Sequence, residues 1–295
     1  MLSREEPEQF RESDYVKQFF RQLRQDKVTL ASLYLFILLL LLVFLGDVIA
    51  PYQADTQFIG KELMPPSWDD KGQIGFFFGT DDLGRDILSR ILSGFYYTVG
   101  SALCISIAIA VIGSIIGIIA GTSRKSFSFL GHLFDTFLFI PILIIAIIIA
   151  TLMEASLINA MLAIFLAMLP HFIHKIYQAT QQELKREYVV TLRLDGASRW
   201  DLIKEVVLPN LAPVATKELA HIFIIAVLDI NALSFIELGA KSPTPEWGTM
   251  IKDSVELIYI APWTVILPGM ATIFVILLSS MLGNGISRVL EKYRY

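Results

Sequence analysis

The chain has 295 residues, of which 55% are hydrophobic and only 18% are charged, whereas a soluble domain usually carries about 25% charged residues. The mean hydropathy of +0.61 and the grouping of apolar residues into long runs indicate an integral membrane protein. The formal net charge of −4, without a block of basic residues, argues against nucleic-acid binding. A single cysteine, Cys104, excludes a disulfide framework or a cysteine-based metal cluster.

Six apolar stretches are each long enough to cross a hydrocarbon core, which takes about 20 helical residues. We predict these spans at 28–46, 98–120, 132–153, 155–173, 219–236 and 264–286. The fold class is therefore an all-α integral membrane protein with six transmembrane helices. The predicted segments are an N-terminal segment (1–27), a first transmembrane helix (28–50), an external segment (51–97), a five-helix transmembrane core (98–286) and a tail (287–295).

The basic residues predict the orientation. Most of the 24 Lys and Arg residues lie before the first span, after the second, between the fourth and fifth, and after the sixth. Because cytoplasmic loops are enriched in these residues, both termini and the connection between the fourth and fifth spans are predicted to be cytoplasmic. The first apolar run is too long for a cleaved signal peptide, so it is interpreted as a transmembrane helix.

Two local patterns predict helix packing. In the external segment, the sequence GTDDLGRDILSRILSGFYY places Ile87, Ile91 and Phe95 on one face, which predicts an amphipathic helix near the outer surface. In the second span, glycines at positions 113, 117 and 121 form two overlapping GxxxG patterns. We favour close packing within the chain over a dedicated dimer interface as the role of these glycines.

Motifs of catalysis are missing from the sequence. It has no GxxxxGK[ST] phosphate loop, no G-x-S-x-G and no H-E-x-x-H, so we predict that the chain is not an enzyme. His171 and His174 have the spacing of two ligands on one helix face, but no third histidine lies near them in the sequence. We interpret the pair as interfacial polar residues and predict no metal site.

Three polar residues lie inside or beside apolar spans: Asp229 and Asn231 in the fifth span, and Asp135 near the start of the third. A carboxylate that faces lipid at mid-span costs at least about 2.5 kcal/mol. These side chains are therefore predicted to face the bundle interior. Two interpretations remain open, because the residues can make hydrogen bonds between helices or line a route for substrate.

The stretch LRLDGASRWDLIKEVVLPN predicts an ordered helix–turn–helix between two apolar spans. Gly196 is suited to the left-handed position at which a helix stops. Ser198 is placed to cap the next helix, with Asp201 three residues later. Pro209 lacks an amide donor and is predicted to end that helix. An ordered and mixed-charge cytoplasmic loop predicts docking to another protein.

This stretch resembles the EAA loop of ABC-transporter permeases, E-A-A-x3-G-x9-I-x-L-P. Gly196, Leu208 and Pro209 match the pattern, Val206 replaces the usual Ile, and Val-Thr-Leu at 190–192 replaces the E-A-A triplet. In the family, the short helix after the glycine inserts into a cleft of the ATPase subunit. The resemblance implies that the ATPase contact is made by Gly196, Ala197, Ser198, Arg199, Trp200, Asp201, Leu208 and Pro209.

Five motifs in order resemble the second-subunit type of the peptide/nickel permease family. They are GTDDLGRDILSRILSG (79–94), DTFLFIPIL (135–143), EYVVTLRLDGAS (187–198), LSFIELGAKSPTPEWGTM (233–250) and APWTVILPG (261–269). The first contains the family's external motif, here Gly79, Asp81, Gly84, Arg85 and Asp86. The chain departs from the family at Glu237 and Ser242. The resemblance implies a type I importer-like fold with a cytoplasmic coupling helix.

The resemblance also implies partners and a role. The chain would pair with a second homologous permease in a bacterial inner membrane, above two ATP-binding subunits that hold ATP and Mg, and would receive substrate from a periplasmic binding protein. It would bind no cofactor itself. Peptides, including antimicrobial peptides, are the expected substrates; a polyamine such as putrescine and the direction of transport remain open. A self-contained secondary transporter and a membrane enzyme are less favoured.

Overall fold

The computed structural model describes residues 21–122 and 140–291, where the regular structure is helical apart from one isolated bridge between Thr80 and Asp86. The α-helices are α2 (Lys27–Ile49), α3 (Ile87–Gly94), α4 (Ser101–Thr122), α6 (Ile142–Thr151), α7 (Leu157–Leu184), α8 (Glu187–Leu194), α9 (Arg199–Asp201), α10 (Leu208–Phe235), α11 (Trp247–Ser254) and α12 (Trp263–Glu291). Two π-helical segments, Phe95–Gly100 and Leu202–Val207, join α3 to α4 and α9 to α10.

Five continuous helical stretches in the described ranges are long and apolar enough to cross a membrane. They are Lys27–Ile49, Ile87–Thr122, Leu157–Leu184, Arg199–Phe235 and Trp263–Glu291. The predicted third span is described only from residue 140 onward and contributes the ten-residue apolar helix α6; Asp135 lies outside the described residues. The all-α fold class is confirmed, and the elements agree approximately with six spans.

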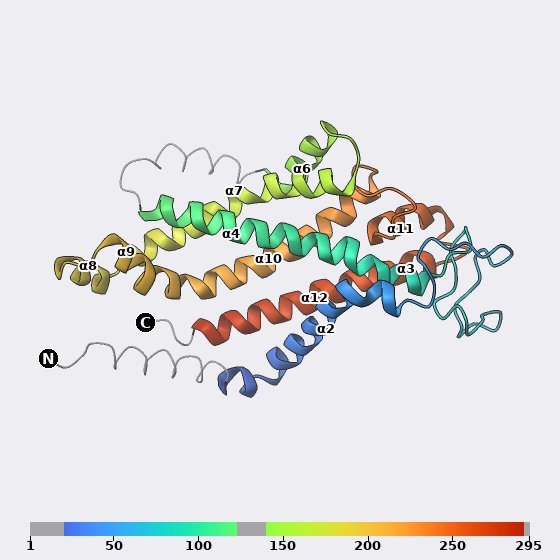
Figure 1. Cartoon of the computed structure of the whole chain (residues 1–295), viewed down its shortest axis with the longest axis horizontal. Helices are drawn as coiled ribbons and strands as arrows, with labels where there is room; N and C mark the ends of the chain where they lie inside the picture. Colours follow the sequence, from blue (N-terminus) through green and yellow to red (C-terminus); the bar gives the residue numbers. More distant parts are fainter. Residues whose placement is uncertain (1–20, 123–139, 292–295) are drawn as a thin grey trace.

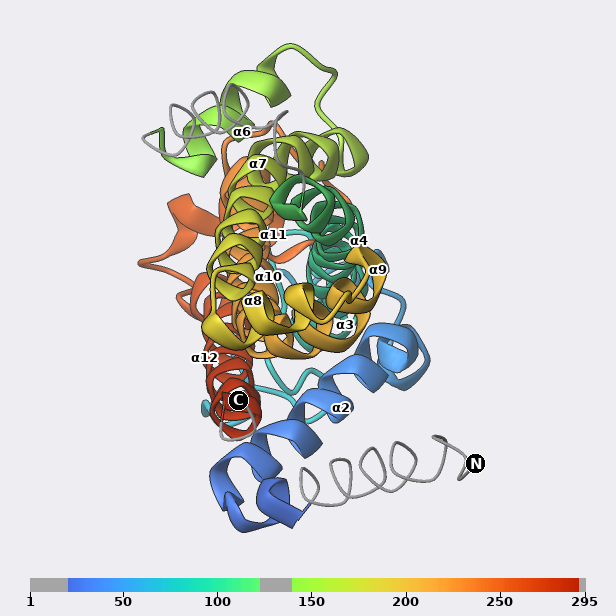
Figure 2. The same ribbon diagram turned by 90° about the vertical axis from the view of Figure 1, so that its left-hand side faces the viewer.

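The long helices lie along the long axis of the molecule (Figure 1). One end of the bundle carries α8 and α9, with the first residues of α2 and the last of α12 nearby. The opposite end carries α3, α11 and the 51–86 segment. Seen along the bundle, α4 packs on α7 and α10 on α12, while α2 lies against α12 (Figure 2). The two ends therefore offer two separate places for functional surfaces.

The glycines of α4 confirm close packing within the chain. A Cβ atom added to Gly113 would lie 2.4 Å from the ring of Phe172, and one on Gly117 would lie 2.8 Å from Ile176, both on α7. Such distances are shorter than any carbon–carbon contact that a core tolerates. The spacing of the glycines therefore lets the two helices pack backbone to side chain along their length.

The amphipathic helix α3 forms as predicted, and its apolar face is covered by other parts of the chain. Ile87 and Ile91 are 1% and 6% exposed, and Phe95 packs edge-on against Trp247 of α11 with ring centroids 5.0 Å apart. The indole Nε1 of Trp247 also donates to the Ile91 carbonyl at 3.2 Å. The apolar face of α3 is therefore buried within the protein, against Trp247 of α11 and against α2, while its position near the outer surface stays a prediction.

Candidate functional site at the 183–210 loop

The first helix of the 183–210 loop ends as the sequence predicts. Gly196 has φ +92°, in the left-handed region. The amide of Ala197 donates to the Leu192 carbonyl at 3.0 Å, and the amide of Gly196 donates to the Arg193 carbonyl at 3.2 Å. These two bonds form a Schellman motif, which satisfies carbonyls that a helix end would otherwise leave unpaired. The chain consequently reverses at a defined point.

The next helix begins with the predicted cap. The Asp201 amide donates to Ser198 Oγ at 3.2 Å, and the Ser198 amide donates to Asp201 Oδ2 at 3.0 Å. This reciprocal pair is a capping box. Because the capping box begins at Ser198, directly after the Schellman motif that includes Ala197, the turn between the helices has a fixed shape without support from a partner.

Pro209 does not end the helix, and that prediction is wrong. The helical stretch continues from Arg199 to Phe235, although its geometry changes at the π-helical segment Leu202–Val207, and Pro209 lies in the first turn of α10. A proline inside a helix removes one hydrogen bond and crowds the carbonyl four residues earlier. Here the π-helical segment Leu202–Val207 directly precedes α10 and widens the backbone at that place. The Asn210 side chain also donates to the Val206 carbonyl at 3.0 Å, within the π-helical segment.

The turn between α8 and α9 exposes large apolar side chains. We call residues 194–201 the exposed turn. Leu194 is 83% exposed and Trp200 is 71% exposed, and Arg199 is exposed beside them. Ala197 is half-buried and packs against the core. An ordered and apolar projection of this kind is typical of a surface that binds another protein.

Sequence reasoning missed a group of side chains that connects this loop to the long helices. Glu183, at the end of α7, is fully buried, and its Oε1 accepts from the Tyr188 hydroxyl at 2.5 Å. Arg186 Nε lies 3.2 Å from the other Glu183 oxygen. Asn210 Nδ2 donates to the Tyr188 hydroxyl at 3.1 Å, in addition to its bond to the Val206 carbonyl. Side chains of α7, α8 and α10 thus meet at one point.

The predicted 79–86 motif lies at the opposite end of the bundle and forms a compact buried cluster. Asp81 Oδ1 accepts from the amides of Leu83 (3.0 Å) and Arg85 (2.9 Å), and its Oδ2 accepts from Arg85 Nε at 2.6 Å. Gly79 and Gly84 both have positive φ, so the chain can turn tightly around the carboxylate. The motif therefore folds the segment that precedes α3.

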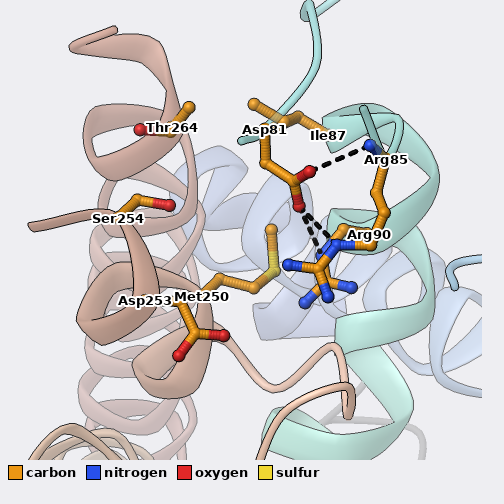
Figure 3. Close-up of a pocket in the computed structure, with 8 residues that line it drawn as sticks. All are labelled: Asp81, Arg85, Ile87, Arg90, Met250, Asp253, Ser254 and Thr264. Atoms are coloured by element: carbon orange, nitrogen blue, oxygen red, sulfur yellow. Dashed lines mark hydrogen bonds and ion pairs between the residues drawn. The ribbon is translucent and has the colours of Figure 1, made fainter. Parts of the chain in front are cut away.

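Two buried arginines share the Asp81 carboxylate (Figure 3). Arg85 and Arg90 are 3% and 1% exposed, and Arg90 Nε lies 3.7 Å from Asp81 Oδ2. Arg90 Nη1 also donates to the carbonyls of Ala54 (3.2 Å) and Pro243 (3.3 Å). The cluster accordingly fastens α3 to two segments that are far apart in the sequence.

Asp86 begins α3 as its N-cap. Its Oδ2 accepts from the Ser89 amide at 2.8 Å and from the Ser89 hydroxyl at 2.6 Å. Burial raises the pKa of the Asp86 carboxyl, and the two bonds from Ser89 oppose this rise. The five predicted motif residues, from Gly79 to Asp86, therefore have structural roles in the turn and the N-cap before α3. Among the described residues, none of the five is arranged as a nucleophile or a general base.

The predicted polar residues of the fifth span face the protein interior. Asp229 is 5% exposed, and its Oδ2 has no hydrogen-bond partner among the described residues. Asn231 Nδ2 donates to the Val227 carbonyl of its own helix at 2.7 Å, while its Oδ1 has no such partner in the described ranges. The Asn231 bond lies within α10 and does not join this helix to another one.

Comparison with known proteins identifies the family. Residues 113–293, more than half of the chain, match the family described as the binding-protein-dependent transport system inner membrane component. The chain belongs to this permease family. Residues 14–66 match a second model, the N-terminal TM domain of oligopeptide transport permease C. The 183–210 loop and the Asp229 region lie within the first match, and the 79–86 motif lies between the two models.

Individual members of the permease family align over nearly the whole chain. The peptide transport system permease protein SapC of Haemophilus influenzae is 54% identical over 99% of this chain and 100% of its own length. SapC of Escherichia coli O6:H1 is 44% identical over 92% of both chains. The di/tripeptide transport system permease protein DppC of Pseudomonas aeruginosa is 34% identical over 94% of this chain and 91% of its own.

A solved structure confirms the fold. Inward-facing conformations of the MetNI methionine ABC transporter include a chain that superposes with a TM-score of 0.57, covering 68% of this chain and 96% of that chain. The sequence identity is 15%, so the likeness concerns the arrangement of helices alone. This protein is thus a multi-pass membrane permease subunit of an ABC transporter with a type I importer-like fold.

Proposed function

We propose that this chain is the non-catalytic permease subunit of an ATP-driven peptide transporter of the bacterial inner membrane, and that its exposed turn docks an ATPase subunit. The observation that carries the proposal is the exposed turn itself. It is a preformed apolar projection, fixed by the Schellman motif and the capping box, within a chain of the permease family. Relatives named as peptide permeases at up to 54% identity favour peptides over polyamines as substrates.

The same end of the bundle faces the cytoplasm in this proposal. The exposed turn lies at the end where α2 begins and α12 finishes (Figure 1). Basic residues gather there, and cytoplasmic loops are enriched in Lys and Arg. The described members are Arg21, Arg24, Lys27, Lys185, Arg186, Arg193, Arg199, Lys204 and Arg288. Both chain termini then lie in the cytoplasm, and the 79–86 motif lies on the periplasmic side.

The complete transporter would contain this chain, a second homologous permease, two ATP-binding subunits and a periplasmic binding protein. ATP and Mg would be held by the ATP-binding subunits, and this chain would hold no cofactor. Closure of the ATPase pair would move the exposed turn and thereby reorient the transmembrane helices. Such coupling requires that ATP and substrate favour different states of one assembly.

Replacing Trp200 with alanine tests the docking role. An exposed tryptophan at a protein interface is a typical hot spot, so we expect the Trp200→Ala permease to bind its ATPase subunits about 30-fold more weakly. The measurement is co-purification of the ATPase subunits with the membrane-extracted permease across a range of concentrations. The matched control is Trp68→Ala, because Trp68 is 63% exposed but belongs to the 51–86 segment at the other end. Equal retention of ATPase by both variants would refute the docking role.

Asp229 is proposed to line the route for substrate. Asp229 is buried, and its Oδ2 lacks a hydrogen-bond partner in the part of the chain that the structure describes; both observations support a polar wall inside the bundle. We expect Asp229→Leu to lower substrate transport about tenfold, equivalent to the loss of about 1.4 kcal/mol of interaction, while the ATPase subunits remain bound. Leu228→Ala is the control, because Leu228 is an exposed residue of the same helix. Unchanged transport by Asp229→Leu in reconstituted vesicles would favour a packing role.

The peptide assignment is tested with the reconstituted complex. Peptides are expected to stimulate ATP hydrolysis by the complete transporter with its binding protein, and putrescine is expected not to do so. Stimulation by putrescine alone would overturn the peptide assignment and would leave the permease assignment intact.

A further inference from the structure

Both connections between the exposed turn and the long helices depart from regular α-helix, and we call these two departures the breaks. On one side, α7 ends at Leu184 and α8 begins only at Glu187, so the helix is broken at residues 185–186. On the other side, the π-helical segment Leu202–Val207 separates α9 from α10. Breaks of either kind are places where helices bend, and π-helical segments occur often at functional sites. A force on the exposed turn would be absorbed at these two breaks unless another contact spans them.

One hydroxyl group spans both breaks. The Tyr188 hydroxyl donates to Glu183 on the α7 side of the first break, at 2.5 Å. The same oxygen accepts from Asn210 on the α10 side of the second break, at 3.1 Å. Asn210 also holds the Val206 carbonyl, which belongs to the π-helical segment itself. A single side chain of α8 is therefore bonded to both long helices.

The burial of these groups makes the connection stiff. Glu183 is fully buried, and the Tyr188 side chain packs against the hydrophobic core. Arg186 Nε, 3.2 Å from Glu183 Oε2, adds a charged partner from the break itself. Hydrogen bonds to a charged group are stronger than neutral ones, and they strengthen further in a low-dielectric interior.

We propose that Tyr188 is a positioning residue whose hydroxyl transmits movement of the exposed turn to α7 and α10. This inference rests on the proposed function, in which the exposed turn docks an ATPase subunit. It concerns a different step, because docking uses the exposed turn whereas transmission uses the buried bonds behind it. Loss of the hydroxyl would leave the docking surface in place and would let the two breaks bend independently.

The test is Tyr188→Phe in the complete transporter reconstituted in vesicles. The phenylalanine ring keeps the packing and removes only the oxygen that joins Glu183 to Asn210. We expect the ATPase subunits to co-purify normally, and the amount of substrate moved per ATP hydrolysed to fall about tenfold, the equivalent of one hydrogen bond to a charged group. The matched control is Tyr259→Phe, because the Tyr259 side chain is 97% exposed and lies near the α11 end. This variant should move the same amount of substrate per ATP as the unaltered transporter.

A second variant separates transmission from simple destabilisation. Asn210→Ala removes the amide that donates to the Tyr188 hydroxyl. Tyr188→Phe and Asn210→Ala both break this connection. The double variant should therefore lower the amount of substrate moved per ATP no further than either single variant does. A purely structural role would reduce assembly, hydrolysis and transport together and leave their ratio unchanged.

The outcomes for Tyr188 and for the exposed turn are distinguishable. An unchanged ratio in Tyr188→Phe, while Trp200→Ala still releases the ATPase subunits, overturns the transmission role alone. Release of the ATPase subunits by Tyr188→Phe also overturns it, because the hydroxyl would then act in docking. Retention of the ATPase by Trp200→Ala refutes the proposed docking role itself.

Discussion

A valine in place of Gly196 is expected to abolish ATPase-coupled transport while the chain still inserts in the membrane. Gly196 has φ +92°, and a β-branched residue in the left-handed region costs about 1–3 kcal/mol. No atom lies within 4 Å of an added Cβ, so the backbone angle alone opposes the substitution. The chain would relieve the strain by giving up the Schellman motif, and the exposed turn would lose its fixed shape.

The chain offers a close control for this prediction. Gly60 has φ +77° and equally open surroundings, but it lies in the 51–86 segment at the far end of the bundle. Gly60→Val therefore imposes similar strain without touching the proposed docking surface. We expect ATPase co-purification and ATP-driven uptake to be lost in Gly196→Val and kept in Gly60→Val. Gly196→Asn should retain much of the activity, because asparagine tolerates the left-handed region. Normal coupled uptake by Gly196→Val would contradict the coupling role.

The exposed turn shows which features could be predicted from local sequence. Gly196, Ser198 and Asp201 act through bonds that span no more than five residues, so their spacing alone predicts the stop and the cap. Pro209 has the same kind of local signal, yet it misleads. The effect of Pro209 depends on whether the preceding helix can widen. The sequence of residues 202–207 contains no pattern that predicts the π-helical segment formed there.

Longer-range features could not be predicted in this way. Tyr188 and Asn210 meet across 22 positions, and Thr98 meets the buried Glu246 across 148. Similarly, the apolar face of α3 predicts that something covers it, without indicating whether lipid or Trp247 does so. Helical periodicity gives the direction of a face, whereas its neighbour is decided by packing among segments that are distant in sequence.

The two ends of the bundle are built on different principles. The exposed turn makes its polar bonds locally, between backbone groups and with the Ser198 and Asp201 side chains, and it presents apolar side chains outward, which suits a surface that must meet a partner. The 79–86 motif does the reverse, because its charges are buried and joined to one another. Stability at that end should therefore depend on charge balance within the cluster.

Replacing Asp81 with asparagine is expected to cause the largest loss of stability. Asp81 is 4% exposed and faces the guanidinium groups of Arg85 and Arg90, which are themselves buried. Removing one partner of a buried ion pair typically costs about 3–5 kcal/mol, because the opposite charge remains without compensation. Asparagine keeps the shape and an oxygen acceptor for the amide of Arg85, so the variant isolates the charge.

The measurement is thermal unfolding of the detergent-purified permease, followed by tryptophan fluorescence. Asp82→Asn is the control, since Asp82 is the exposed neighbour of Asp81, and its replacement should change stability by no more than about 0.5 kcal/mol. If Asp81→Asn unfolds at the same midpoint temperature as Asp82→Asn, the buried arginines do not need the Asp81 carboxylate for stability. A second comparison uses Arg90→Met, which should lower the stability of the unaltered chain more than it lowers the stability of the Asp81→Asn variant. In Asp81→Asn the Arg90 guanidinium has already lost its carboxylate partner, so removing this guanidinium costs less.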